Sequence, residues 1–171
     1  MSTSTSSPPT IRGARERERS RRACRTSRCS CGLPTRAGLD AALARGPRSH
    51  AELGRVTWDD PCHLCHAQGV RKEPRALLDL VPGIERVELP GSELCCGSAG
   101  IYTMLRPADS EAIFAPKLAA LDASGARVLV TANPGCQLQW ETGIARERRD
   151  VKVLHLAELL ERATRPADGS R

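Results

Sequence analysis

From residue 55 onward, the chain alternates short apolar runs with longer segments of helical spacing. The apolar runs are rich in Val, Leu and Ile, and they predict strands at residues 55–58, 86–89, 127–131 and 151–155. The segments between and after them predict helices at residues 68–80 and 110–124, from residue 134 or 135, and at 157–163. Strands that alternate with helices are typical of a parallel sheet, so the sequence predicts an α/β fold with helices on both faces.

The first 50 residues have a different composition. They contain none of the four aromatic residues, open with a Ser, Thr and Pro run, and hold 11 arginines against three acidic residues. Such a segment buries too little apolar surface to offset the entropy of ordering it. We therefore predict a disordered basic tail at residues 1–50, ending in a short helical pattern over 37–53, then a folded domain at 51–166 and a short tail at 167–171.

The formal net charge of +6 belongs to this tail. Residues 51–171 carry 15 basic and 17 acidic side chains, which argues against a nucleic-acid partner for the predicted domain. No apolar run approaches the length of a membrane span, and no secretory signal follows Met1. We expect a cytoplasmic protein whose eight cysteines are reduced.

Cysteines follow three of the predicted strands. Cys62 lies in DPCH after the first strand, Cys95 and Cys96 lie in CCG after the second, and Cys136 lies in NPGC after the third. In an open α/β sheet, functional groups gather outside the carboxyl ends of the strands. The fold therefore predicts four thiols at one edge of the sheet.

Four thiolates at one edge favour a soft metal centre, either an iron–sulfur cluster or zinc. Neighbouring residues in an extended strand point to opposite sides, so Cys95 and Cys96 can share a centre only if the backbone turns there. Gly97 permits such a turn and leaves backbone N–H groups free for cluster sulfides. Two alternatives are plain packing of small apolar thiols and thiol–disulfide chemistry through vicinal cysteines or the Cys62/Cys65 pair.

Other residues near these cysteines have weaker signals. Cys65 and His63 are candidates for additional ligands because they stand within three residues of Cys62. Asp59 and Asp60 precede Pro61, which predicts turn formers, and Arg75 belongs to a basic helix face predicted to contact solvent. The spacing of the tail cysteines matches neither a zinc knuckle nor a ferredoxin run; these are Cys24, Cys29 and Cys31.

The phrases DPCHLCHAQGVR, ELPGSELCCGSAGIYTMLRP and VLVTANPGCQLQ resemble the cysteine-rich CCG domain family over residues 55–164. This family occurs in heterodisulfide reductase B subunits, lactate-utilisation iron–sulfur proteins and glycolate oxidase iron–sulfur subunits. The chain looks most like the C-terminal part of the glycolate oxidase subunit. It lacks that subunit's two ferredoxin-type cysteine runs and its earlier CCG repeat. The resemblance implies a small Rossmann-like parallel-sheet domain.

The resemblance also implies a role and its residues. The family's metal ligands fall on Cys62, Cys95, Cys96 and Cys136, which suffice for a [4Fe–4S] cluster, while Asn133 stands where the family has one more cysteine. Such a chain is expected to be a non-catalytic electron-transfer subunit. It would pass electrons from a flavoprotein that oxidises glycolate toward quinone, with peripheral membrane association through the complex. A zinc-binding structural module, or a protein like heterodisulfide reductase or the lactate-utilisation proteins, is the alternative.

Overall fold

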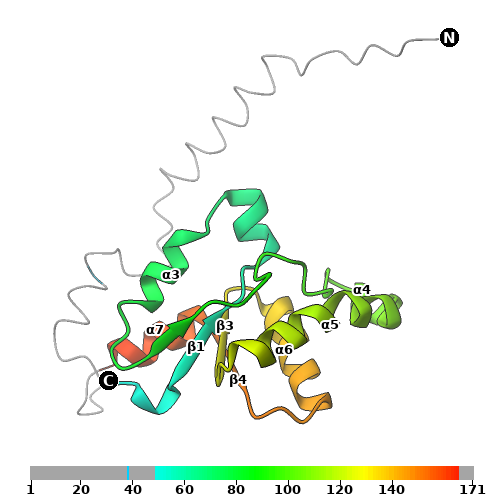
Figure 1. Ribbon diagram of the computed structural model, residues 1–171. Coiled ribbons are helices and arrows are strands. Elements are labelled where there is room, and N and C mark those ends of the chain that lie inside the picture. Colours follow the sequence, from blue (N-terminus) through cyan, green and yellow to red (C-terminus); the bar gives the residue numbers. More distant parts are fainter. Residues whose placement is uncertain (1–37, 39–48, 166–171) are drawn as a thin grey trace, which may run out of the picture. The chain divides into compact units, whose positions relative to one another are not determined.

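Figure 1 shows a computed structural model of the chain, which describes residue 38 and residues 49–165. Most of the predicted N-terminal tail, its three cysteines, the predicted C-terminal tail and most of the helical pattern over 37–53 lie outside these residues. Within that pattern, the described part contains one 3-10 turn, η1 at Ala51–Leu53. In the part of the chain that is described, no helix is long and apolar enough to cross a membrane.

Four parallel strands form one sheet at the centre of the domain (Figure 1). They are β1 at Arg55–Trp58, β2 at Glu85–Val87, β3 at Val128–Thr131 and β4 at Lys152–His155. Their spatial order is β2-β1-β3-β4, so the chain winds outward in one direction from β1 and in the other from β3. The point between β1 and β3, where the direction of winding changes, is where ligands bind in open α/β sheets.

Helices cover both faces of the sheet, which confirms the predicted α/β class. Leu78 of α3 (Lys72–Leu78) and Leu159 of α7 (Leu156–Thr164) share one core with Val128 and Val130. The opposite core contains Leu129 and receives α5 (Pro107–Ser124) and α6 (Pro134–Arg146). The alternation along β3 follows from the two-residue period of a strand, which points successive side chains to opposite faces.

The largest difference from the predicted elements lies after β1. In place of one helix over 68–80, a π-helical turn, η2 at His63–Gln68, precedes the shorter α3. Gly69 separates them with a left-handed backbone (φ 70°), and Pro74 has no N–H to donate, so it is tolerated only in the first turn of a helix. These two residues explain why a single helix does not run through the segment. A short helix, α4 at Tyr102–Leu105, was also not predicted.

Candidate functional site

The three cysteine-bearing segments lie at the carboxyl edge of the sheet. Cys62 follows β1, Cys136 lies in the first turn of α6 directly after β3, and the Cys95-Cys96 loop connects β2 to α4. Residues 40 positions apart meet there, because the sulfur atoms of Cys96 and Cys136 are 3.2 Å apart and both side chains are buried. The structure therefore brings two of the four predicted ligands into contact.

Cys62 and Cys95 are exposed at the same edge. The Cys95 sulfur accepts a hydrogen bond from the backbone N–H of Gly97 at 3.3 Å. Contact with Cys96 and burial raise the pKa of Cys136, and a thiolate at Cys62 adds a smaller contribution in the same direction. Among residues 49–165, no three Cys, His, Asp or Glu side chains are already gathered as a metal site. Four-cysteine ligation thus stays a prediction.

The buried Cys96 and Cys136 behave as one titrating pair. Hydrogen bonding with Cys136 lowers the pKa of Cys96 to about 7, against the opposing effect of burial, and the backbone N–H of Ser98 assists. The same contact raises the pKa of Cys136, because a second thiolate beside the first would be repelled. The metal-free pair therefore retains a proton that a bound cation would displace.

The structure explains why a glycine follows the two cysteines of the CCG sequence. Gly97 adopts φ 81°, a backbone region that side chains other than glycine rarely occupy. A Cβ atom at this position would stand 2.6 Å from the backbone oxygen of Ser110 in α5. Ser110 in turn donates its hydroxyl to the Gly97 carbonyl at 2.9 Å. The predicted turn after Cys96 is confirmed, and it also allows the loop to approach α5 closely.

Asn133 stands at the position where the family pattern has a cysteine, and it caps α6. Its side-chain oxygen accepts hydrogen bonds from the backbone N–H groups of Gly135 (2.8 Å) and Cys136 (3.1 Å). The Asn133 amide nitrogen therefore faces His63 Nδ1 at 3.2 Å. Because an amide nitrogen can only donate, His63 Nδ1 is the acceptor of this hydrogen bond. Asn133 thus fixes the turn that carries Cys136 and connects it with the segment after Cys62.

The additional ligand candidates have other partners in the structure. Cys65 is buried, and its sulfur lies 4.0 Å from the Asp60 carbonyl oxygen and 3.9 Å from that of Cys62. Burial raises the pKa of the Cys65 thiol. His63 is engaged with Asn133. Both remain predictions as ligands, and neither is placed against the Cys96 and Cys136 pair by a recorded contact.

A buried ion pair lies at the same edge. The Lys117 ammonium of α5 is 2.5 Å from Asp59 Oδ1, and both side chains are 1% exposed. The other carboxylate oxygen of Asp59 accepts from the Thr131 hydroxyl at 3.2 Å. Burial raises the pKa of Asp59, while Lys117 and its hydrogen bonds oppose that rise. Asp59 is therefore an ion-pair partner between elements, rather than only the turn former that its place before Pro61 predicted.

Asp60 forms a second network with a different cation. Arg75 donates to both carboxylate oxygens at 2.9 and 2.7 Å, Ser92 donates its hydroxyl at 2.7 Å, and the Trp58 indole donates at 2.6 Å. Burial alone would raise the pKa of Asp60, but these donors outweigh it and lower the pKa. The basic helix face of Arg71, Lys72 and Arg75 was predicted to contact solvent: Arg71 and Lys72 are exposed, but the prediction was wrong for Arg75, which is half-buried against Asp60. Sequence reasoning missed both networks, since a turn signal at Asp-Asp-Pro gives no indication of distant partners.

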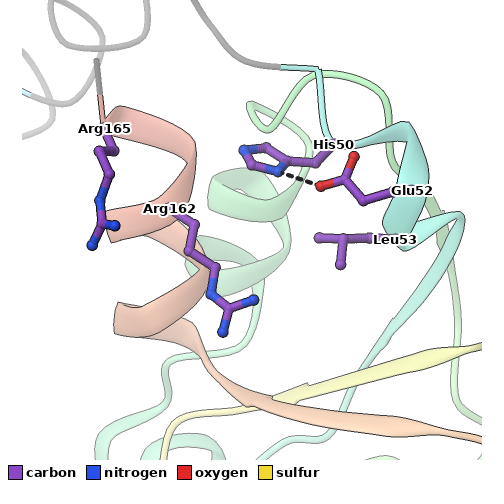
Figure 2. A pocket seen from close by; sticks show the side chains of 5 residues that line it. All are labelled: His50, Glu52, Leu53, Arg162 and Arg165. Carbon is purple, nitrogen blue, oxygen red and sulfur yellow. Dashed lines mark hydrogen bonds and ion pairs between the residues drawn. The ribbon is translucent and has the colours of Figure 1, made fainter. Parts of the chain in front are cut away.

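A cavity of about 160 Å³ lies away from these thiols, between η1 and α7 (Figure 2). His50 Nδ1 lies 3.0 Å from Glu52 Oε1, a hydrogen bond that Figure 2 marks with a dashed line. The two arginines that line it, Arg162 and Arg165, each pair with a glutamate one turn earlier in α7. No cysteine lines this cavity, so it does not belong to the candidate metal site.

The donor set at the carboxyl edge fits an iron–sulfur or zinc centre. Sulfur ligands suit these metals, and the buried Cys96 and Cys136 pair already has its sulfur atoms in contact. Two further thiols, Cys62 and Cys95, have exposed side chains at the same edge. Backbone N–H groups of the loop after Cys95 are directed at sulfur, as outer donors to a cluster are.

Comparison with known proteins agrees with the motif analysis. The family model described as "Cysteine-rich domain" (CCG) matches residues 56–141. A probable glycolate oxidase iron-sulfur subunit of Bacillus subtilis is 46% identical over 107 residues. Lactate utilization protein A of the same organism is 37% identical over 106 residues, and the B subunit of fumarate reductase (CoM/CoB) of Methanothermobacter marburgensis is 38% identical over 110 residues.

These alignments cover most of the present chain and a minor part of each relative. They include 61%, 62% and 64% of this chain, but 24%, 44% and 22% of the three relatives in the same order. The chain therefore matches less than half the length of each relative.

Proposed function

The chain belongs to the cysteine-rich CCG domain family, and on that premise we propose that it holds an iron–sulfur cluster and transfers electrons within an oxidoreductase complex. The observation that carries the proposal is the buried contact between Cys96 and Cys136, 3.2 Å apart at the carboxyl edge of the sheet. Two buried thiols that come to one place from segments far apart in the sequence supply part of the ligand set of a sulfur-ligated centre. The names of the relatives, an iron-sulfur subunit among them, support the same class.

In this proposal, Cys62, Cys95, Cys96 and Cys136 hold a [4Fe–4S] cluster. Such a cluster, when bound, accepts and releases single electrons. The protein would hold the thiolates in register and exclude water from Cys96 and Cys136. It would also direct the backbone N–H of Gly97 at sulfur, which stabilises the charge on the ligands.

The finer part of the proposal concerns the complex. A flavoprotein subunit would oxidise a hydroxy acid such as glycolate, and this chain would pass the electrons on toward quinone. The support is the similarity to a glycolate oxidase iron-sulfur subunit and to lactate utilization protein A. Electron delivery to quinone would place the protein in the cytoplasm, at the inner face of the membrane through its partners.

The test is anaerobic expression of the full chain with metal analysis and an ultraviolet–visible spectrum. We expect about four irons per chain and a broad absorption band at ~400 nm. Cys96→Ser should abolish both, because it removes one of the two buried sulfur ligands. Cys29→Ser is the matched control, since it changes a thiol whose spacing from Cys24 and Cys31 matches neither a zinc knuckle nor a ferredoxin run.

The other outcomes separate the alternatives. A colourless protein with one zinc per chain would make the domain a structural or interaction module. A protein without metal, even after reconstitution with iron and sulfide, would contradict the proposal. Iron retained in full by Cys96→Ser would contradict the assignment of this residue as a ligand.

A further inference from the structure

Lys117 is a charged residue in an apolar surrounding. The chain has 26 basic residues, of which only three are lysines, and Lys117 is 2% exposed. It lies beside Phe114 and Leu118 of the core, with its ammonium 5.9 Å from the centroid of the buried Trp140 ring. Charged side chains are almost never buried so completely unless they are paired.

The ammonium group is surrounded by three acceptors. It donates to the carbonyl oxygens of Ser92 at 2.8 Å and Leu94 at 2.6 Å, and it pairs with Asp59 Oδ1 at 2.5 Å. An ammonium group has three N–H donors: two of them go to backbone carbonyls, and its charge is paired with the buried Asp59 carboxylate. A planar guanidinium could not reproduce this compact arrangement, which explains a lysine in a chain that otherwise favours arginine.

The three acceptors belong to the segments that carry the thiols. Asp59 lies three residues before Cys62, and Leu94 directly precedes Cys95. The segment of Cys136 is connected to Lys117 indirectly, through Asp59. The second carboxylate oxygen of Asp59 accepts a hydrogen bond from Thr131 at the end of β3, five residues before Cys136. One buried cation thus connects all three cysteine-bearing segments.

Stability alone gives little reason for such a pair. Replacing a buried ion pair by apolar residues of similar volume is often neutral or stabilising, because desolvation cancels much of the attraction. The position of the charge offers a second role. The ammonium donates to the carbonyl of Leu94 at 2.6 Å, and Leu94 directly precedes Cys95, so this buried charge lies close to the loop that carries two of the thiols.

We propose that Lys117 is a positioning residue for the cluster, which holds the three cysteine-bearing segments in register through Asp59, Ser92 and Leu94 and places a fixed positive charge close to the loop of Cys95 and Cys96. This inference rests on the proposed function for its cluster. The connection of the three segments is a property of the protein itself and can also be measured without metal.

The first experiment compares the full-length wild type with Lys117→Met, using Lys72→Met, an exposed lysine of α3, as the matched control. We expect Lys117→Met to lose iron to a chelator roughly 10- to 100-fold faster, as removal of groups behind metal ligands does. The midpoint potential of the remaining cluster should shift to more negative values, because a positive charge is lost. Lys72→Met should match the wild type in both.

Asp59→Asn removes a negative charge, whereas Lys117→Met removes a positive one. If Lys117→Met does not fold, the inference is tested on Asp59→Asn alone. Asparagine keeps the shape, its one side-chain oxygen can still accept from Lys117, and its amide nitrogen can donate to the Thr131 hydroxyl. The cluster should therefore be retained, and its potential should shift to more positive values. A merely structural role would not produce shifts of opposite sign. Wild-type iron release together with unchanged potentials would overturn the inference.

A metal-free measurement separates this inference from the proposed function. Diamide oxidises two adjacent thiols to a disulfide and takes up their two electrons and two protons, and peptide mass spectrometry reports the Cys96 to Cys136 link. We expect the link to form several-fold more slowly in Lys117→Met than in Lys72→Met. Equal rates would overturn the positioning role, whereas a wild type without iron would contradict only the proposed function.

Discussion

The two ends of the sheet carry charges in opposite ways. At the carboxyl edge, Asp59 pairs with Lys117 and Asp60 pairs with Arg75, and both carboxylates are at most 4% exposed. At the amino edge, the ion pairs join the starts of strands or the segments before them and are mostly exposed: Arg55 with Glu85, Arg127 with Asp150 and Arg149 with Asp122. Each amino-edge carboxylate is at least half exposed.

The difference shows which edge is constrained. An exposed pair contributes ~0–1 kcal/mol and can be exchanged freely, whereas a buried charge must keep its partner. The carboxyl edge carries the cysteines, and its charges hold loops that would otherwise have no fixed relation to one another. The amino edge carries no cysteine among the described residues, so its charged side chains have no thiol-bearing loop to hold in place.

The largest effect should come from breaking the buried pair. Asp59→Ala leaves the Lys117 charge buried without its counter-ion, so we expect a loss of about 3–5 kcal/mol in the free energy of unfolding. Asp150→Ala at the amino edge should cost less than about 0.5 kcal/mol, because Asp150 is 99% exposed. Urea denaturation of the metal-free protein measures both.

Equal losses from these two substitutions would remove the distinction between the edges. A small loss from Asp59→Ala alone would mean that water or a rearranged side chain compensates Lys117. The double variant Asp59→Asn with Lys117→Met, which removes both charges, should recover much of the lost stability.

The second effect concerns the backbone at the carboxyl edge. Gly97→Ala must accept a positive φ and a Cβ that meets the Ser110 backbone oxygen at 2.6 Å, so we expect a loss of about 2 kcal/mol or more. Gly100→Ala has a similar φ of 66° but open space around the new atom, and it should cost about 1 kcal/mol. The difference between their unfolding midpoints isolates the close contact with α5. If Gly100→Ala costs as much, backbone conformation alone explains the glycine.

Helix capping at the same edge should have a smaller effect. Asn133 accepts two backbone N–H groups at the start of α6, so Asn133→Ala should cost about 1 kcal/mol. His155 caps α7 with one acceptor contact at 3.2 Å, and His155→Ala should cost less. Thermal unfolding of the two variants provides the comparison. A larger loss for His155→Ala would contradict the ranking.

Local patterns predicted the fold and the position of the thiols well. The strand β1 begins and ends where the apolar run predicted, and α6 begins at Pro134 directly after Asn133. Both follow from signals within a few residues: β-branched and apolar runs for strands, and an Asn-Pro start for a helix. Since cysteines follow three parallel strands, the topology alone carries them to one edge.

Long-range partners could not be predicted in the same way. Lys117 has the sequence neighbours of an ordinary helix residue, and nothing near it indicates that Asp59 is its counter-ion. The π-helical turn at His63–Gln68 likewise depends on where the chain must go after Pro61. Buried polar networks and irregular helices are set by tertiary contacts, which a single sequence does not display.

The smallest effect should be found at the amino edge, where pH and salt distinguish exposed from buried charge. Two hydrogen bonds from Arg149, at 2.7 and 2.8 Å, lower the pKa of Asp122. A lowered carboxyl pKa stabilises the folded state above the unfolded-state value of about 3.9, and this contribution is lost as the pH falls through the folded-state pKa. Asp122→Asn should therefore cost less than about 1 kcal/mol in the free energy of unfolding at neutral pH, and its difference from the wild type should shrink below about pH 4.

Salt distinguishes this exposed pair from the buried one. Because Asp122 is half exposed, ~1 M salt should remove most of the effect of Asp122→Asn. The cost of Asp59→Ala should persist, because salt screens a buried pair much less. Salt-resistant stabilisation by Asp122 would show that the amino edge is as constrained as the carboxyl edge.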